Sequence, residues 1–186
     1  HSNGEKMEIV KKYHPLLVGL HWFLAILIIL LLANGNLMKT MTHVDDPQKI
    51  MLLKAHLIAG FMVLFLMISR LIVRLKSDKP EPMDTGSTFK NKLGKYSHIF
   101  LYVVVFGALG SGIATSILGG VPDVAFFGSG DIASLDNLDD VPTKIFHTVW
   151  TWILLGMIIL HFSAAMYHQL IRKDGLMSRM WFGKRK

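Results

Sequence analysis

The chain has 186 residues, of which 52% are hydrophobic, and it carries a formal net charge of +7. A single soluble core needs fewer apolar residues than this, so much of the apolar surface is expected to face lipid. The sequence contains no cysteine, which excludes disulfides, iron–sulfur clusters and haem attached covalently through a C-x-x-C-H motif.

Four long apolar blocks follow one another along the chain, and each is close to the ~20 residues that cross a hydrocarbon core. They predict an all-α fold, a four-helix transmembrane bundle that forms a single membrane domain. The predicted helices cover residues 16–34, 49–75, 96–119 and 143–170.

The first block is not expected to be a cleaved signal peptide. It is long, it lacks a small-residue cleavage site, and it contains a histidine, His21. Residues 1–6 show no pattern that predicts structure, and we expect them to be a foreign remnant without a role.

The basic residues are concentrated in three segments, which are the N-terminal tail, the stretch from Arg70 to Lys95 and the C-terminal tail from Arg172 to Lys186. The positive-inside rule therefore predicts that both termini are cytoplasmic. This distribution indicates membrane topology and no nucleic-acid partner. The other two connections hold Lys39, Lys49, Lys54 and Lys144 alongside Asp45, Asp46, Asp123, Asp131, Asp136, Asp139 and Asp140.

Histidines within the predicted spans carry the chemistry, because ionisable side chains are costly in a bilayer and tend to mark functional sites. In the first three helices, His21 lies near the inner end, His56 near the outer end and His98 near the inner end. On the fourth helix, His147 lies near the outer end and His161 follows toward the cytoplasm.

The 14-residue spacing from His147 to His161 puts both side chains on nearly one helix face, roughly 21 Å apart. Depth pairs His147 with His56 on the outer side and His161 with His21 on the inner side. Two imidazoles on opposite faces of a porphyrin form a low-spin bis-histidine haem, which suits electron transfer because no coordination position stays open. The sequence therefore predicts two non-covalent b-type haems.

Further residues fit such sites, and each has an ordinary alternative role. Gly60 lies one turn beyond His56, where a flat macrocycle needs close approach to the backbone, and Gly107, Gly110 and Gly112 line the third helix in the same way. Small residues also serve helix packing, which is the alternative for all four. Arg70 at the inner depth and Lys144 at the outer depth are candidate partners for haem propionates. Both can equally be interfacial anchors.

Other readings of the histidines are weaker. A structural zinc site would gather its ligands at one depth, whereas these divide between two. His168, seven residues beyond His161, is the main rival for the inner ligand. His14 and His43 lie at the membrane edge and are expected to be surface residues.

The sequence resembles the bacterial cytochrome b561 family, which includes a superoxide oxidase, over nearly its whole length. The similar segments are the early His21-Trp22, HLIAGFMVLFLMISRLIVRLK from His56 to Lys76, KIFHTVWTWILLGMIILH from Lys144 to His161, and RKDGLMSRM after His168. The resemblance implies that His21, His56, His147 and His161 bind two b haems in a multi-pass protein of the bacterial inner membrane. It also implies electron transfer between the quinone pool and an outer partner or small oxidant, with ubiquinone as substrate.

The outer partner stays open at this point. Superoxide is an anion, and the connections assigned to the outside hold seven aspartates against four lysines. The excess of aspartates favours a cationic redox protein over superoxide as the outer partner, unless the charge near Lys54 and Lys144 is locally positive. Alternative functions are a haem-bearing anchor subunit that exchanges electrons with a separate redox protein, and a metal transporter whose histidines line a path.

We further predict a quinone site at the cytoplasmic end, built around His168 with help from His98. Quinone reduction takes up protons as well as electrons, and histidine can supply protons near neutral pH. The alternative is that either histidine is an interfacial side chain bonded to a backbone carbonyl or to water.

Overall fold

The structure is a computed structural model that describes residues 11–40, 47–82 and 84–184. Within these ranges the chain is helical with connecting turns and contains no strand. Four helical stretches are long and apolar enough to cross a membrane, which confirms the predicted transmembrane bundle. They are α1 (Pro15–Lys39), α2 (Pro47–Lys76), α3 (Thr88–Leu118) and the stretch Pro142–Arg172, which begins with α4 (Pro142–Met166). The expectations for residues 1–6 and for His43 lie outside the described residues.

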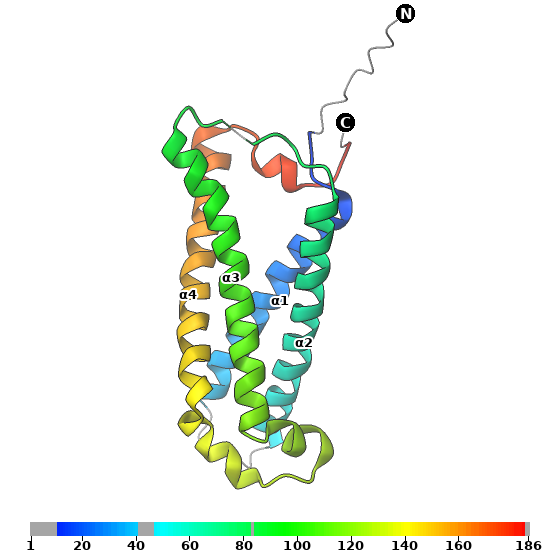
Figure 1. Cartoon of the computed structure of the whole chain (residues 1–186), viewed down its shortest axis with the longest axis vertical. Helices are drawn as coiled ribbons and strands as arrows, with labels where there is room; N and C mark the ends of the chain where they lie inside the picture. Colours follow the sequence, from blue (N-terminus) through cyan, green and yellow to red (C-terminus); the bar gives the residue numbers. More distant parts are fainter. Residues whose placement is uncertain (1–10, 41–46, 83, 185–186) are drawn as a thin grey trace, which may run out of the picture.

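The helices pack as two antiparallel hairpins. α1 packs mainly on α2 and α3 mainly on α4, whereas contacts between the hairpins, such as those of α2 with α3, are sparser. The described chain begins and ends at the same end of the bundle, beside the connection from α2 to α3 (Figure 1). We call this the inner end and the opposite end the outer end. The arrangement leaves room for a site between the hairpins.

Proline and polar caps fix where the helices begin. α1, α2 and α4 begin at Pro15, Pro47 and Pro142, which suits a residue that has no N–H to satisfy in the first turn. The His14 side chain caps α1 by accepting a hydrogen bond from the backbone N–H of Leu16 at 3.2 Å. His14 therefore has a structural role at the helix terminus.

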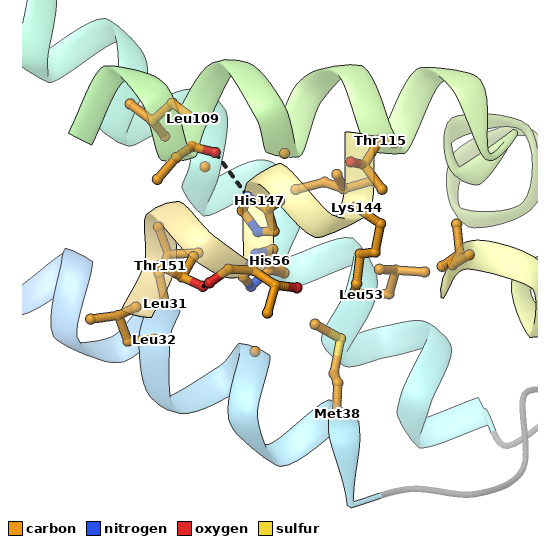
Figure 2. A pocket seen from close by; sticks show the side chains of 18 of the residues that line it. Leu31, Leu32, Met38, Leu53, His56, Leu109, Thr115, Lys144, His147 and Thr151 are labelled. Atoms are coloured by element: carbon orange, nitrogen blue, oxygen red, sulfur yellow. Dashed lines mark hydrogen bonds between the residues drawn. The ribbon is translucent and has the colours of Figure 1, made fainter. Parts of the chain in front are cut away.

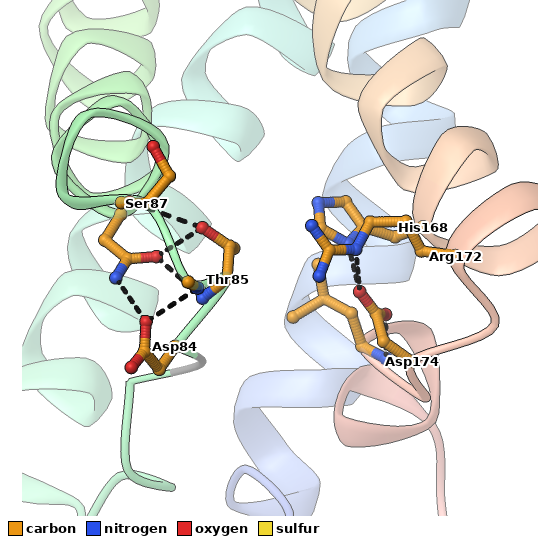
Figure 3. A network of polar contacts seen from close by, with 9 residues as sticks. Asp84, Thr85, Ser87, His168, Arg172 and Asp174 are labelled. Atoms are coloured by element: carbon orange, nitrogen blue, oxygen red, sulfur yellow. Dashed lines mark hydrogen bonds and ion pairs between the residues drawn. The ribbon is translucent and has the colours of Figure 1, made fainter.

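α3 begins well before the predicted start at residue 96, because a polar network at residues 84–91 caps it (Figure 3). The Asp84 carboxylate accepts hydrogen bonds from the Asn91 amide and the Gly86 backbone N–H, both at 2.9 Å. These bonds hold the pKa of Asp84 below its usual value. Ser87 is the N-cap residue and accepts from the Lys90 backbone N–H. The early start places His98 well inside the helix.

The fourth span changes its winding before it ends. α4 passes into a π-helical turn, η3 (Tyr167–Arg172), and Lys173 then takes a left-handed backbone conformation with φ of 52°. A π-turn closes i→i+5 hydrogen bonds and is wider than an α-turn. The regular angular spacing that aligned His168 with His161 does not hold across this turn.

An apolar layer fills the middle of the bundle and includes residues from all four helices. Its buried members are Leu24, Val63, Met67, Val104, Val105, Ala108 and Leu154. Tyr102, Phe106 and Trp150 pack against them, and the first two rings stack with centroids 6.5 Å apart. This layer separates the outer histidines of α2 and α4 from the inner histidines of α1, α3 and α4.

Each end of the bundle is covered by a folded segment. At the outer end, the π-helical turn η1 (Asp123–Phe127) and the 3-10 helix η2 (Ile132–Asp140) form a second small core against Leu53 and Leu57 of α2. At the inner end, residues 174–183, which include η4 (Met177–Met180), lie across the end of α1. The Trp22 indole N–H donates to the Met180 carbonyl at 2.9 Å, and Trp22 also meets Trp181 edge to face.

Replacement of Gly107 by alanine should destabilise the α3–α4 hairpin, because a Cβ there would lie 2.7 Å from ring carbons of Trp150. Overpacking of this kind costs about 1–3 kcal/mol. We therefore expect a lower thermal unfolding midpoint in detergent. Gly110→Ala is the matched control, since no atom lies within 4 Å of its Cβ position. Equal midpoints for the two variants would mean that Gly107 has no packing role.

Candidate functional site

His56 of α2 and His147 of α4 face each other across the two hairpins near the outer end (Figure 2). Their ring centroids lie 6.4 Å apart, with an angle of 88° between the ring planes. Two imidazole nitrogens that bind one metal from opposite sides, each at about 2 Å, bring their ring centres to roughly 6 Å. The spacing therefore fits a bis-histidine site, and it brings together two residues that sequence reasoning paired.

The orientation of His147 is set by α3. Its Nδ1 lies 2.9 Å from the Ala108 carbonyl oxygen, and the Ser111 hydroxyl is 3.4 Å away. A carbonyl only accepts, so Nδ1 carries the proton and the Nε2 lone pair is free to bind a metal. Gly112 allows this approach, because a Cβ there would lie 2.9 Å from Cε1 of His147.

A cavity of about 580 Å³ opens beside the two rings, and Gly35, Gly60, Gly112 and Lys144 contribute to its lining. This volume falls in the usual range for cofactor and ligand sites. The Cβ position of Gly60 is open, since no atom lies within 4 Å of it, so its predicted role beside a cofactor stays a prediction. The space, the free lone pair of His147 and the ring spacing together fit a haem.

Lys144 lies at the same cavity and pairs only loosely with Asp139. The two charged atoms are 3.9 Å apart, and the Asp139 side chain is almost fully exposed. Surface pairs of this kind contribute about 0–1 kcal/mol. Lys144 can therefore exchange this partner for another anion at the cavity.

Three histidines gather at the inner end. The ring centroid of His161 lies 6.1 Å from that of His21 and 5.6 Å from that of His98. Nδ1 of His98 is 2.7 Å from the Gly94 carbonyl, which leaves its Nε2 lone pair free as well. The predicted pair of His21 and His161 is present, but His98 has the geometry of a second partner for His161.

Arg70 is buried among these inner histidines, with 8% of its surface exposed. Its guanidinium donates a hydrogen bond of 2.7 Å to the Leu17 carbonyl. Among the described residues no carboxylate pairs with it. The Tyr102 hydroxyl on α3 is also buried and lies beside the Arg70 guanidinium, but it carries no charge that would balance the cation. A buried cation needs an anion, so Arg70 has the surroundings expected of a propionate partner.

His168 lies apart from this group and is held by Asp174, which follows the end of the span (Figure 3). Nδ1 of His168 is 2.6 Å from the Asp174 carboxylate, and Nε of Arg172 is 3.3 Å from the same oxygen. Burial raises the pKa of Asp174, but hydrogen bonds from His168 and the Leu176 N–H outweigh this, so the pKa lies below its usual value. The structure places His98 beside His161 and His168 beside Asp174.

Within the described residues no group of three His, Asp or Glu side chains is arranged to hold a lone metal ion. The inner histidines form two ring pairs that share His161. The arrangement therefore matches axial ligation of a planar cofactor better than a zinc site.

Sequence reasoning missed the place of His98 in the inner group and the supporting carbonyls of Ala108 and Gly94. Backbone acceptors carry no sequence signal of their own. The cap of α3 does carry one, since the polar residues Asp84, Ser87 and Asn91 precede the apolar block. Recognition of that cap would have moved the helix start toward residue 88 and His98 deeper into the bundle.

Comparison with known proteins gives one family for nearly the whole chain. The family described as prokaryotic cytochrome b561 matches residues 12–183. A probable superoxide oxidase of Yersinia pestis, CybB, is 27% identical over 94% of this chain and 98% of its own length. Two cytochrome b561 homologs of Escherichia coli K12 are also similar; homolog 2 is 24% identical over 91% of both chains, and homolog 1 is 25% identical over 88% of this chain and 93% of its own.

Proposed function

Because the chain belongs to the prokaryotic cytochrome b561 family, we propose that it binds two b-type haems and transfers electrons between an outer donor and the quinone pool. The family binds b-type haem and takes part in electron transport, and this chain is a bacterial multi-pass membrane protein. The observation that carries the proposal is the facing pair of His56 and His147, spaced for bis-histidine ligation beside a cavity.

In this proposal His56 and His147 hold the outer haem, and His21 and His161 hold the inner one. When bound, each haem supplies a one-electron couple. Groups of the chain would fix the position of each haem. The Ala108 backbone carbonyl orients His147, Arg70 would neutralise inner propionates and Lys144 would neutralise outer ones. The apolar layer around Val63, Val104 and Leu154 keeps water from the space between the two sites.

We propose superoxide as the outer donor, and local charge supports this choice. Among the described residues, three outer lysines, Lys39, Lys49 and Lys144, line the cavity together with two aspartates, Asp136 and Asp139. Within this part of the chain, the excess of outer aspartates is not repeated at the cavity. A positive surface at the entrance of a site attracts small anions, and the similar protein of Yersinia pestis is named a probable superoxide oxidase.

The proposed reaction balances with quinone as the acceptor. Two superoxide anions each give up one electron and leave as dioxygen, and the quinone takes up two electrons and two protons to become quinol. His168 is proposed to deliver protons at the inner end, since Asp174 fixes its Nδ1 and leaves Nε2 for the substrate. The basic inner segments favour an orientation with both termini in the cytoplasm, in the inner membrane.

Replacement of His147 or His56 by alanine should reduce the haem content from two per chain to one, because each loses an axial ligand of the outer haem. A pyridine haemochrome assay on purified protein measures this ratio. His14→Ser is the control, since serine keeps the N-cap and should retain both haems. A folded His147→Ala variant with two haems would rule out the outer pair.

The inner ligands can be separated in the same assay. His21→Ala should remove the inner haem, whereas His98→Ala should leave it in place. The reverse result would assign the iron to His98 and His161, which are the other closely spaced pair at this end.

Lys39→Glu should slow oxidation of superoxide on the order of tenfold at low ionic strength, because it reverses a charge at the outer cavity. Stopped-flow haem reduction by superoxide measures the rate, which should fall in the unaltered protein as salt rises. Lys90→Glu makes the same change in net charge at the inner end of α3 and should have little effect. Equal effects of the two variants would argue against local steering.

Replacement of His168 by alanine should leave both haem spectra intact and slow electron exchange with ubiquinone by roughly a hundredfold, the contribution of a positioned proton donor. Asp174→Asn should act in the same direction, because it removes the charge that holds Nδ1. Asp84→Asn, at another inner aspartate that accepts a backbone N–H, is the control. If the rate of electron exchange with ubiquinone is unchanged in both His168→Ala and Asp174→Asn, the quinone binds elsewhere. If His168→Ala loses the inner haem, His168 is a haem ligand.

A further inference from the structure

Two buried polar atoms on neighbouring helices have no hydrogen-bond partner among the described residues and lie close to the outer site. One is Nδ1 of His56 on α2, and the other is Oδ1 of Asn34 on α1. Unpaired buried polar groups cost free energy, and they are uncommon unless a ligand, a water or a rearrangement completes them.

Contacts between α1 and α2 place both groups at one point of the interface. The Asn34 Nδ2 donates to the Leu52 carbonyl at 3.3 Å, one helical turn before His56. The adjacent Gly35 packs on the His56 ring, with its Cβ position 3.4 Å from Cε1 and 3.9 Å from Nδ1. The Nδ1 edge of the ring therefore faces the turn of α1 that carries Asn34.

Two other buried histidines, His147 and His98, differ from His56 in this respect. Nδ1 of His147 is bonded to the Ala108 carbonyl and Nδ1 of His98 to the Gly94 carbonyl. A histidine that binds metal through one nitrogen almost always donates its other N–H to an acceptor, which fixes the ring and raises its basicity. His56 lacks such an acceptor, and Asn34 holds an unused one.

We propose that Asn34 is the positioning residue of the outer haem site, whose Oδ1 accepts a hydrogen bond from the Nδ1–H of His56 when that ring binds iron through Nε2. This inference rests on the proposed function. The two atoms are not bonded to each other in the structure, so the proposed bond requires the two side chains to rotate toward each other. The amide suits the role because its Nδ2 is already committed to Leu52.

The bond has a consequence for the redox chemistry. A hydrogen bond from Nδ1–H to an acceptor makes the imidazole a stronger donor to iron and favours the oxidised state, as hydrogen bonds to metal ligands generally do. Asn34→Leu removes the acceptor and should raise the midpoint potential of the outer haem. Asn34→Asp supplies a stronger acceptor and should lower it.

The test is a redox titration of the purified two-haem protein followed by its optical spectrum. The redox transition that is missing from the titration of His147→Ala belongs to the outer haem. The transition of the inner haem serves as the internal control. We expect about a tenfold shift of the outer-haem redox equilibrium in opposite directions for the two variants, or 59 mV for a one-electron couple. Asn34→Ala replaces Asn34→Leu if the larger side chain prevents folding, which loss of the inner haem would reveal.

The outcomes separate this inference from the proposed function. An unaltered protein without haem, or a His56→Ala variant that keeps two haems, would overturn the proposed ligation itself. If His56→Ala loses a haem but no Asn34 variant changes the midpoint potential of the outer haem, only the role of Asn34 is overturned. That result would indicate water as the acceptor. Shifts in the same direction for leucine and aspartate would overturn it as well.

Discussion

The structure depends on one requirement, which is that the nitrogens of imidazole rings buried in a bundle of apolar helices have bonding partners. A polar ring buried among hydrocarbon side chains is costly unless both nitrogens are engaged. At the outer site this requirement is met on one side by the Ala108 carbonyl, which takes Nδ1 of His147, and the proposed haem would take Nε2 on the other. Close approach then requires glycine at position 112. The ring, its acceptor and the glycine on the facing helix form one unit, which fixes how α3 and α4 pack.

The same reasoning applies to charge at the inner end. Arg70 is buried, and its contact with the Leu17 carbonyl satisfies a donor without neutralising the cation. An ion buried alone costs several kcal/mol, so the fold is expected to complete the site with an anion from outside the chain. A haem propionate would serve, and it would lie beside the inner histidines that Arg70 accompanies.

Sequence reasoning found the spans and the depth of the paired histidines, because hydropathy and a regular rise per residue determine both. It did not find features that depend on irregular backbone. The cap around Asp84 moves the start of α3 to Thr88, and His98 on this helix lies beside His161. The π-turn at Tyr167–Arg172 interrupts the regular α-helical spacing just before His168. The charge at the outer cavity was also missed, since it depends on where η2 places two aspartates rather than on loop totals.

The two ends of the bundle differ in what can reach them, and this difference bears on the direction of the proposed electron path. The outer histidines border a cavity with lysines among its lining residues, which is open to a small anion from water. At the inner end, residues 174–183 close over α1 through the bond from Trp22 to Met180 and the contact of Trp22 with Trp181. That cover is largely aromatic and apolar next to His21, so a substrate that approaches from the lipid is favoured there over one from solvent. The proposed water-soluble donor and lipid-soluble acceptor would therefore be matched to opposite ends of the same bundle.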